Sequence, residues 1–275
     1  MARENNEIKI LVPLNDHAFK RMFGEENCEL QLIVLLNGLM ERTGENAIKK
    51  LTIIEKRIPR EQYGDKEIEL DVVAITDAGE QFNIESQLRN VDTDSRFTYY
   101  GARQLTHSIG KGQNYKMMKK IRVITILGFK SKERDKDEGY YKYEKTNEFL
   151  EKYEFNLPKF ENLKNKDVNN PQHRCLMFLS EKTNEKMRKK VIEMEPELAK
   201  AQEIMDRINS SPEEIELYEM RELVKMDIQN ARERDLQEGK EEEKMEITIK
   251  LKAMGISTEK IAKATNLSLE IIEKL

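Results

Sequence analysis

Tryptophan is absent from the 275-residue chain, and cysteine and histidine are scarce, with two and three residues respectively. Cys28 and Cys175 lie far apart in the sequence and belong to no C-x-x-C pair. Zinc sites draw their ligands from clustered Cys and His, and disulfide frameworks need several spaced cysteines. The scarcity therefore excludes a structural zinc site and a disulfide-stapled fold.

Long apolar segments are missing as well. No run approaches the roughly 20 apolar residues of a membrane-spanning helix, and the opening MARENNEIKI lacks the apolar stretch of a secretory signal. The formal net charge is −4, from 48 basic and 52 acidic residues. These features predict a soluble, cytoplasmic protein with no membrane partner, and any nucleic-acid binding has to use a local basic patch.

Residues 1–180 alternate short apolar runs with helical stretches, which is typical of a mixed α/β domain. Helices are expected at 16–24, with Asp16 as N-cap, and at 28–42 and 92–118. The apolar run 175–180 fits a strand or a helix equally well. Runs rich in Ile, Val, Thr and Phe predict strands at 51–58, 68–76, 81–88 and 123–129.

From residue 181 the composition changes. Residues 181–246 are rich in charged side chains and predict a solvated helical connector. Residues 247–275 carry Gly255, Ser257 and Asn266 where short helices would end and begin, as in a small helix-turn-helix-like unit. A net charge of about +2 is weak for a DNA reader. An oligomerisation or capping element is an equally good interpretation, so a homo-oligomer could form through the C-terminal helices.

Two of the predicted strands meet at T-D-A-G-E (76–80), which has the pattern of a β-hairpin. In a three-residue loop the last residue adopts a left-handed conformation, which suits Gly79. Counting outwards from that loop places Asp71 opposite Glu85. A two-residue turn would shift the register and place Asp71 opposite Ser86 instead.

The three-residue loop also places Glu69 opposite Gln87, so several polar side chains share one face of the hairpin. Like charges that face each other directly destabilise a sheet unless something compensates them. A bound Mg²⁺ or Mn²⁺ would do so, since oxygen ligands on rigid strands suit these ions. The alternative is a solvated sheet face, or pairing of the acids with Arg or Lys from a neighbouring element.

The segments LNDHAFKRMFG, ELDVVAI, FNIESQLR, SRFTYYGARQL and KIRVITILGF follow one another along the chain. In order and spacing they resemble the PD-(D/E)XK nuclease family transposases, also called recombination-promoting nucleases. The resemblance spans about residues 11–180 and extends loosely to the tail. It implies a restriction-endonuclease-like α/β fold, with a mixed central sheet flanked by helices and a helical C-terminal extension. It also implies that a strand Asp and a Glu on the next strand bind Mg²⁺ or Mn²⁺, and the matching positions are Asp71 and Glu85.

The third position of the superfamily pattern is Lys, whereas this chain has Gln87. A Gln at this position is similar to the pattern of the transposase branch, but its chemistry differs from that of Lys. A Lys would supply positive charge to the attacking water and the phosphate, whereas Gln can only position them by hydrogen bonding. More of the catalysis would then fall to the metal ion.

Further candidates lie on the predicted helices. Asp16 and Lys20 match the NDxxFK signature of the family, and Phe19 between them is expected in the core. Asp16 is a helix cap or a functional acid.

Arg96, Tyr100 and Arg103 recur at helical spacing, so they share a face that can hold a phosphate; helix-surface packing is the alternative. Lys116 begins a locally basic segment, 116–145, which suits contact with a nucleic-acid backbone or a surface hairpin.

These observations favour a metal-dependent DNA endonuclease that hydrolyses phosphodiester bonds and is associated with recombination or a mobile element. Its catalytic residues would be Asp71, Glu85 and Gln87. The alternative is a catalytically weak or inactive protein of the same fold that acts as a nucleic-acid-binding or protein-interaction module. Asp71 and Glu85 favour the first hypothesis, whereas Gln87 and the acidic balance favour the second.

Overall fold

The computed structural model describes residues 11–54, 57–58, 68–89, 93–129 and 139–275. The chain forms two compact units, residues 1–215 and residues 216–275. Among the described residues, no helix is both long and apolar enough to cross a membrane.

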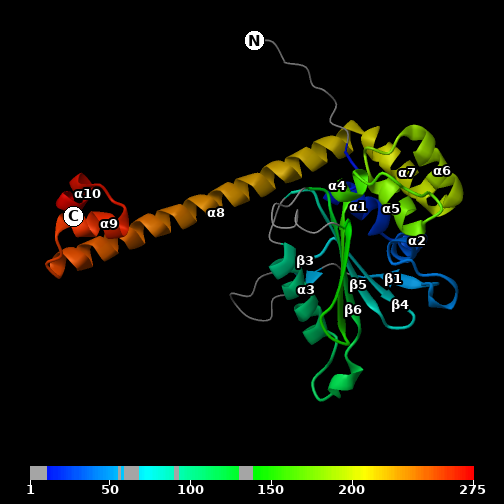
Figure 1. The fold of residues 1–275 in the computed structure, drawn as a ribbon, viewed down its shortest axis with the longest axis horizontal. Helices are drawn as coiled ribbons and strands as arrows, with labels where there is room; N and C mark the ends of the chain where they lie inside the picture. The colour runs from blue at the N-terminus through cyan, green and yellow to red at the C-terminus, as the bar shows by residue number, and fades with distance from the viewer. Residues whose placement is uncertain (1–10, 55–56, 59–67, 90–92, 130–138) are drawn as a thin grey trace, which may run out of the picture. The chain divides into compact units, whose positions relative to one another are not determined.

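The first unit is built around a mixed sheet with the strand order β1-β4-β5-β6-β8-β7 (Figure 1). The pairs β5–β6 and β6–β8 are parallel and the other neighbours are antiparallel. Two short strands, β2 and β3, pair separately. The strands are β1 (Leu51–Ile53), β2 (Arg57–Ile58), β3 (Ile68–Glu69), β4 (Val72–Thr76), β5 (Gln81–Gln87), β6 (Ile121–Leu127), β7 (Tyr141–Lys145) and β8 (Leu150–Asn156).

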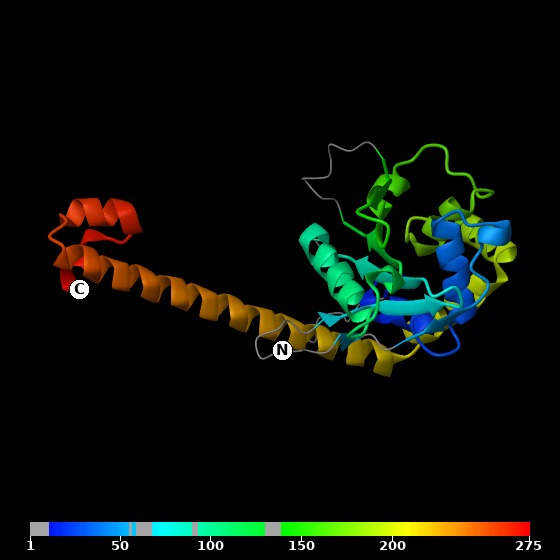
Figure 2. The ribbon, with the colours of Figure 1, turned by 90° about the horizontal axis from the view of Figure 1, so that it is seen from below.

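Helices cover both faces of this sheet, α3 on one and α1, α2 and α5 on the other (Figures 1 and 2). The central strand β6 is accordingly buried along its whole length, as expected for a strand covered on both sides. The helices of the unit are α1 (Asp16–Phe23), α2 (Glu29–Leu39), α3 (Thr93–His107), α4 (Leu157–Glu161), α5 (Pro171–Leu179), α6 (Glu185–Met194) and α7 (Pro196–Asn209), with 3₁₀ turns at Gly44–Asn46 and Tyr115–Met117.

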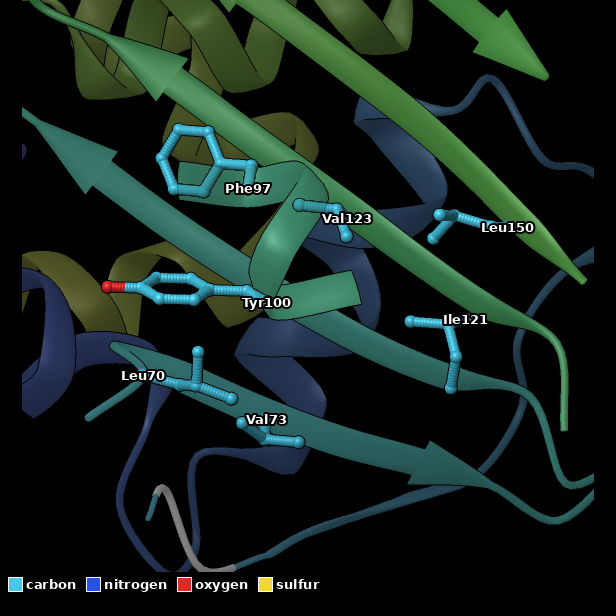
Figure 3. Close-up of a cluster of buried hydrophobic side chains, with 7 residues drawn as sticks. All are labelled: Leu70, Val73, Phe97, Tyr100, Ile121, Val123 and Leu150. Carbon is cyan, nitrogen blue, oxygen red and sulfur yellow. The ribbon is translucent and has the colours of Figure 1, made fainter. Parts of the chain in front are cut away.

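A cluster of buried side chains holds α3 on the sheet. Phe97 and Tyr100 of α3 point down onto the strands, and their rings meet edge to face with centroids 6.0 Å apart. Figure 3 shows the Tyr100 hydroxyl pointing out of this cluster, past Leu70, which lies two residues before β4. The cluster consists of Leu70, Val73, Phe97, Tyr100, Ile121, Val123 and Leu150.

The predicted α/β architecture is confirmed, while several element boundaries differ from the predictions. The strand expected at 68–76 is divided between β3 and β4. The strand expected at 51–58 is represented by β1 and β2, with residues 55–56 outside the described ones. The run 175–180 belongs to helix α5.

Two further differences lie between residues 92 and 156. Helix α3 ends at His107, well before residue 118. The basic surface segment contributes an edge strand, β7, which pairs with β8. The sequence pattern did not predict β8, because its apolar residues are interleaved with charged ones such as Glu151, which pairs with Arg122 of β6.

The first unit extends to residue 215 and thus includes α6 and α7, which a division at residue 180 assigns to the connector. Helix α7 packs on α1 and α2. Its buried residues are Leu198, Ala201, Met205 and Ile208.

The second unit contains most of the long helix α8 (Pro212–Ala253), followed by α9 (Thr258–Thr265) and α10 (Leu269–Lys274). Ile261, Leu267 and Ile272 form its small core, with Leu251 packed against them. Asn266 ends α9 in the left-handed conformation, with a φ of 56°. Helices thus end and begin near Gly255, Ser257 and Asn266, while the helix-turn-helix-like unit stays a prediction.

Gly38 marks a close approach of α2 and α5. A Cβ at this position would lie 2.3 Å from the Sγ of buried Cys175 and 3.0 Å from the Pro171 carbonyl oxygen. Gly38→Ala should therefore push the two helices apart and lower the free energy of unfolding by about 1–3 kcal/mol. Urea denaturation measures the effect.

Gly239→Ala in α8 is the matched control for Gly38→Ala, because nothing lies within 4 Å of a Cβ there. This control should be neutral or stabilising by up to about 1 kcal/mol, through helix propensity. A Gly38→Ala protein as stable as wild type would contradict the close packing of α2 on α5.

Candidate active site

The hairpin between β4 and β5 determines which side chains meet at the site. Gly79 adopts the left-handed conformation, with a φ of 78°. Val72 pairs with Ile84, which is the register of a three-residue loop. The predicted register is thus confirmed, and it brings Asp71, just before β4, next to Glu85 in β5.

The polypeptide bends at Asp71, so that its carboxylate takes part in the hydrogen bonding of the sheet. The Ser86 N–H donates to Asp71 Oδ2 at 3.0 Å. The Asp71 N–H donates to Glu85 Oε1 at 3.3 Å. The two carboxylates are therefore tied to each other's strand and lie side by side.

Glu69 does not take the position predicted for it. In the small sheet it pairs with Arg57, not with Gln87. The bend at Asp71 interrupts the strand that periodicity had carried straight through to residue 69. The expected pairing of Glu69 with Gln87 is therefore wrong, and the side chain of Glu69 lies outside the described part of the chain.

Glu85 and Asp71 are both buried, with Glu85 0% and Asp71 8% exposed. Burial raises the pKa of Glu85 well above its usual value, and the neighbouring Asp71 carboxylate raises it further. Burial also raises the pKa of Asp71, against the opposing charge of Lys20. Glu85 Oε2 has no hydrogen-bond partner among the described residues. Such a pair is costly without a nearby cation.

Helix α1 brings Asp16 and Lys20 to the acids. Lys20 Nζ lies 3.3 Å from Asp71 Oδ1, and the charge of Asp16 is among the causes that raise the pKa of Asp71. The predicted N-cap role of Asp16 is wrong, because the side chain of Asn15 caps α1 by accepting from the N–H groups of His17 and Ala18. Asp16 is instead the first residue of the helix.

Helix α3 contributes Arg96 and Tyr100 from the opposite face. Arg96 Nε donates to the Tyr100 hydroxyl, and its guanidinium lies 5.2 Å from the centre of the same ring. The positive charge of Arg96 opposes the rise in the pKa of Glu85. Burial raises the pKa of Tyr100, and the charges of Glu85 and Asp71 add to that rise. Of the predicted α3 face, Arg96 and Tyr100 thus lie towards the acid pair.

Two other predicted residues lie away from the acids. Arg103 is two turns beyond Arg96 along α3, about 10 Å further at the usual rise. Lys116 precedes the start of β6, where Ile121 pairs with Gln81 at the opposite end of β5 from Glu85. The structure therefore does not bring Lys116 to the site, and residues 130–138 of the basic segment lie outside the described ones.

Gln87 is the last residue of β5. Strand alternation puts it on the same face as Glu85, and its side chain is half-buried. Its backbone carbonyl accepts from the Gly128 N–H at 2.8 Å, which fixes the end of the strand beside β6.

The family model of the PD-(D/E)XK nuclease family transposases matches residues 13–235. The chain belongs to this family. No curated protein and no solved structure matches the chain.

Membership in the PD-(D/E)XK nuclease family transposases supports a nuclease- or transposase-like function. It also confirms the resemblance and agrees with the mixed sheet and flanking helices. PD-(D/E)XK nucleases generally use divalent metal ions.

The acid pair fits a divalent cation in its chemistry. Within the described ranges, no group of three or more His, Cys, Asp and Glu side chains is placed to hold a metal. Asp71 and Glu85 nevertheless offer carboxylate oxygens, the ligands that Mg²⁺ and Mn²⁺ prefer. Glu85 Oε2, which has no hydrogen-bond partner within those ranges, is buried beside Asp71 and would gain an interaction with such an ion. Mg²⁺ commonly takes only one or two protein carboxylates and keeps several waters.

The buried carboxylate of Glu85 leads to a stability prediction with a definite sign. Folding raises its pKa, so the stability it contributes is present below the unfolded pKa and is lost as pH rises through the folded pKa. Glu85→Gln, which mimics the neutral acid, should therefore raise the melting temperature at about pH 8 in metal-free buffer and have little effect near about pH 4. Thermal unfolding at the two pH values measures this.

Glu144→Gln is the matched control, since this strand glutamate of β7 is exposed. Its carboxylate lies 3.9 Å from the Lys152 ammonium at the surface, and its loss should change the melting temperature little at either pH. A Glu85→Gln protein less stable than wild type at the higher pH would show that ionised Glu85 stabilises the fold.

Proposed function

We propose that this protein is a metal-dependent DNA endonuclease that hydrolyses phosphodiester bonds in the cytoplasm, in recombination or for a mobile element. The observation that carries the proposal is the pair of buried carboxylates, Asp71 and Glu85, in which Glu85 Oε2 has no hydrogen-bond partner in the described part of the chain. Burying two adjacent carboxylates is costly unless a cation compensates their charge, and a divalent ion would do so.

Asp71 and Glu85 would hold the Mg²⁺ or Mn²⁺. When bound, such an ion acts as a Lewis acid towards the phosphate and lowers the pKa of a bound water. The ion would also compensate the charge repulsion that raises the pKa of Glu85.

Groups around the acids would bind the phosphate and position the attacking water. Arg96 is oriented by its bond to the Tyr100 hydroxyl, and its other N–H groups suit the non-bridging oxygens of a phosphodiester. The Gln87 amide can donate to one oxygen and accept from a water, so it can align a water with the phosphorus atom. α3 and the sheet keep this end of the site partly buried, which strengthens each of these interactions.

A second function, nucleic-acid binding without cleavage, is favoured by one specific observation. Lys20 already neutralises part of the Asp71 charge without a metal ion, and Gln87 brings no positive charge. A protein of this kind would bind DNA through its basic side chains and leave it intact.

A titration of plasmid and RNA cleavage with Mg²⁺ and Mn²⁺, with wild type and Asp71→Ala in parallel, tests the two functions. The proposed endonuclease nicks DNA only with metal, and Asp71→Ala does not nick it. Binding measured in parallel without metal should weaken steeply with salt, since phosphate contacts dominate such binding. Wild type that binds DNA in either metal yet never nicks it would support the non-catalytic function.

A further inference from the structure

Within the described part of the chain, the cations shown beside the acid pair, Lys20 and Arg96, belong to helices, and β5 itself carries no Lys or Arg. Lys20 Nζ of α1 lies 3.3 Å from Asp71 Oδ1, and its charge opposes the rise in the pKa of both Asp71 and Glu85. The Lys20 side chain is 24% exposed, whereas that of Asp71 is 11% exposed. The ammonium therefore lies at the boundary between the buried acids and solvent, where a phosphate would approach.

Phosphodiester hydrolysis accumulates negative charge on the phosphate oxygens, beside two carboxylates that are already negative. Gln87, the polar residue next to Glu85 on the same strand face, is neutral. Arg96 is held by the Tyr100 hydroxyl and ring on the α3 side. On the α1 side, Lys20 is the cation that directly contacts the acids.

We infer that Lys20 is a phosphate-binding cation of this site, which supplies from α1 the positive charge that Gln87 on β5 does not. The inference rests on the proposed endonuclease function. In the absence of metal, Lys20 pairs with Asp71. When Asp71 binds a divalent ion, the ammonium donates hydrogen bonds to a phosphate oxygen beside it.

This role has a signature that a purely structural ion pair lacks. Lys20 competes with the divalent ion for Asp71, so removing its charge should leave metal affinity equal or higher. The same change should slow cleavage, because the charge that develops on the phosphate loses a partner. If Lys20 only held Asp71 in position, its loss would weaken metal binding and cleavage together.

The experiment compares wild type, Lys20→Gln, Lys20→Arg and the double variant Lys20→Gln/Gln87→Lys. Ca²⁺ binding to the full chain is measured by calorimetry, and single-turnover plasmid cleavage is measured in Mg²⁺. Lys189→Gln, an exposed lysine on α6, is the control for loss of one charge. Lys20→Met replaces Lys20→Gln if the latter does not fold.

Lys20→Gln should cleave at least about tenfold more slowly than wild type, with Ca²⁺ bound at least as tightly. Lys20→Arg should keep more activity than Lys20→Gln, and the double variant should recover part of the lost rate. Lys189→Gln should match wild type in both measurements.

Three results would overturn the inference, and they differ from a failure of the proposed function. Cleavage by Lys20→Gln at the wild-type rate, weaker Ca²⁺ binding together with slower cleavage, or no recovery in a double variant that still binds Ca²⁺ would each refute it while the endonuclease function stands. Wild type that never cleaves would refute the proposed function, and this inference with it.

Discussion

Replacing Asp71 or Glu85 by alanine should reduce Mg²⁺-dependent plasmid cleavage by at least about a hundredfold. Each change removes a carboxylate that would hold the ion, and such an ion supplies several kcal/mol of charge stabilisation in the transition state. Gln87→Ala should retain more activity than either, because it removes a positioning group and no negative charge. Gln87→Lys should raise the rate unless its charge expels the ion.

Asp71→Ala also removes the acceptor for the Ser86 N–H, so the loss of activity has to be separated from a loss of folding. Asp71→Asn keeps an oxygen for that N–H and removes the charge, and it should be equally inactive while it unfolds at a similar temperature. Glu144→Ala on β7 controls for the loss of a strand carboxylate. Cleavage by Asp71→Ala at the wild-type rate would refute the assignment of the site.

A chain ending at residue 180 should fail to form a stable core, whereas one ending at residue 215 should fold. Helix α7 buries Leu198, Met205 and Ile208 against the first unit. A fully buried side chain of this size contributes about 1.5–3 kcal/mol, and a whole domain is stable by only about 5–15 kcal/mol. The Asn209 side chain also binds the backbone N–H and carbonyl of Leu11, at 2.8 and 3.1 Å.

Circular dichroism and urea denaturation of the two truncated chains measure this difference. The chain ending at residue 215 should unfold cooperatively and the shorter one should not. Cooperative unfolding of the chain ending at residue 180 would instead support the division at that residue, with 181–275 dispensable for the core.

The hairpin register could be predicted from the sequence because it depends on local chemistry. Gly79 is suited to a left-handed loop position, and one loop length then determines the partner of every residue in β4 and β5. On the N-terminal side of β4 the predicted pairing of Glu69 with Gln87 fails, because the chain bends at Asp71. A hydrogen bond from the Ser86 N–H to the Asp71 carboxylate stabilises that bend. No residue within the strand signals that bend.

Contacts between helices and strands could not be predicted in the same way. The NDxxFK signature made Lys20 a candidate, but only the packing of α1 shows that it pairs with Asp71. Asn15 and Asp16 are both good N-cap residues, and the sequence does not decide between adjacent ones. The edge strand β7 was missed because its residues are exposed and polar, and it depends on pairing with β8.

The bond from the Ser86 N–H to Asp71 affects how relatives of this chain should be interpreted. If the pairing of β4 with β5 continued without the bend, Ser86 would face residue 70 and donate to its backbone carbonyl. The Asp71 carboxylate accepts that hydrogen bond instead. A descendant that lost cleavage through other positions would still be selected to keep this Asp, because its loss leaves a buried N–H unsatisfied. An Asp at this position is therefore a marker of the fold, and an inactive relative is better recognised from changes at Glu85, Lys20 and Arg96.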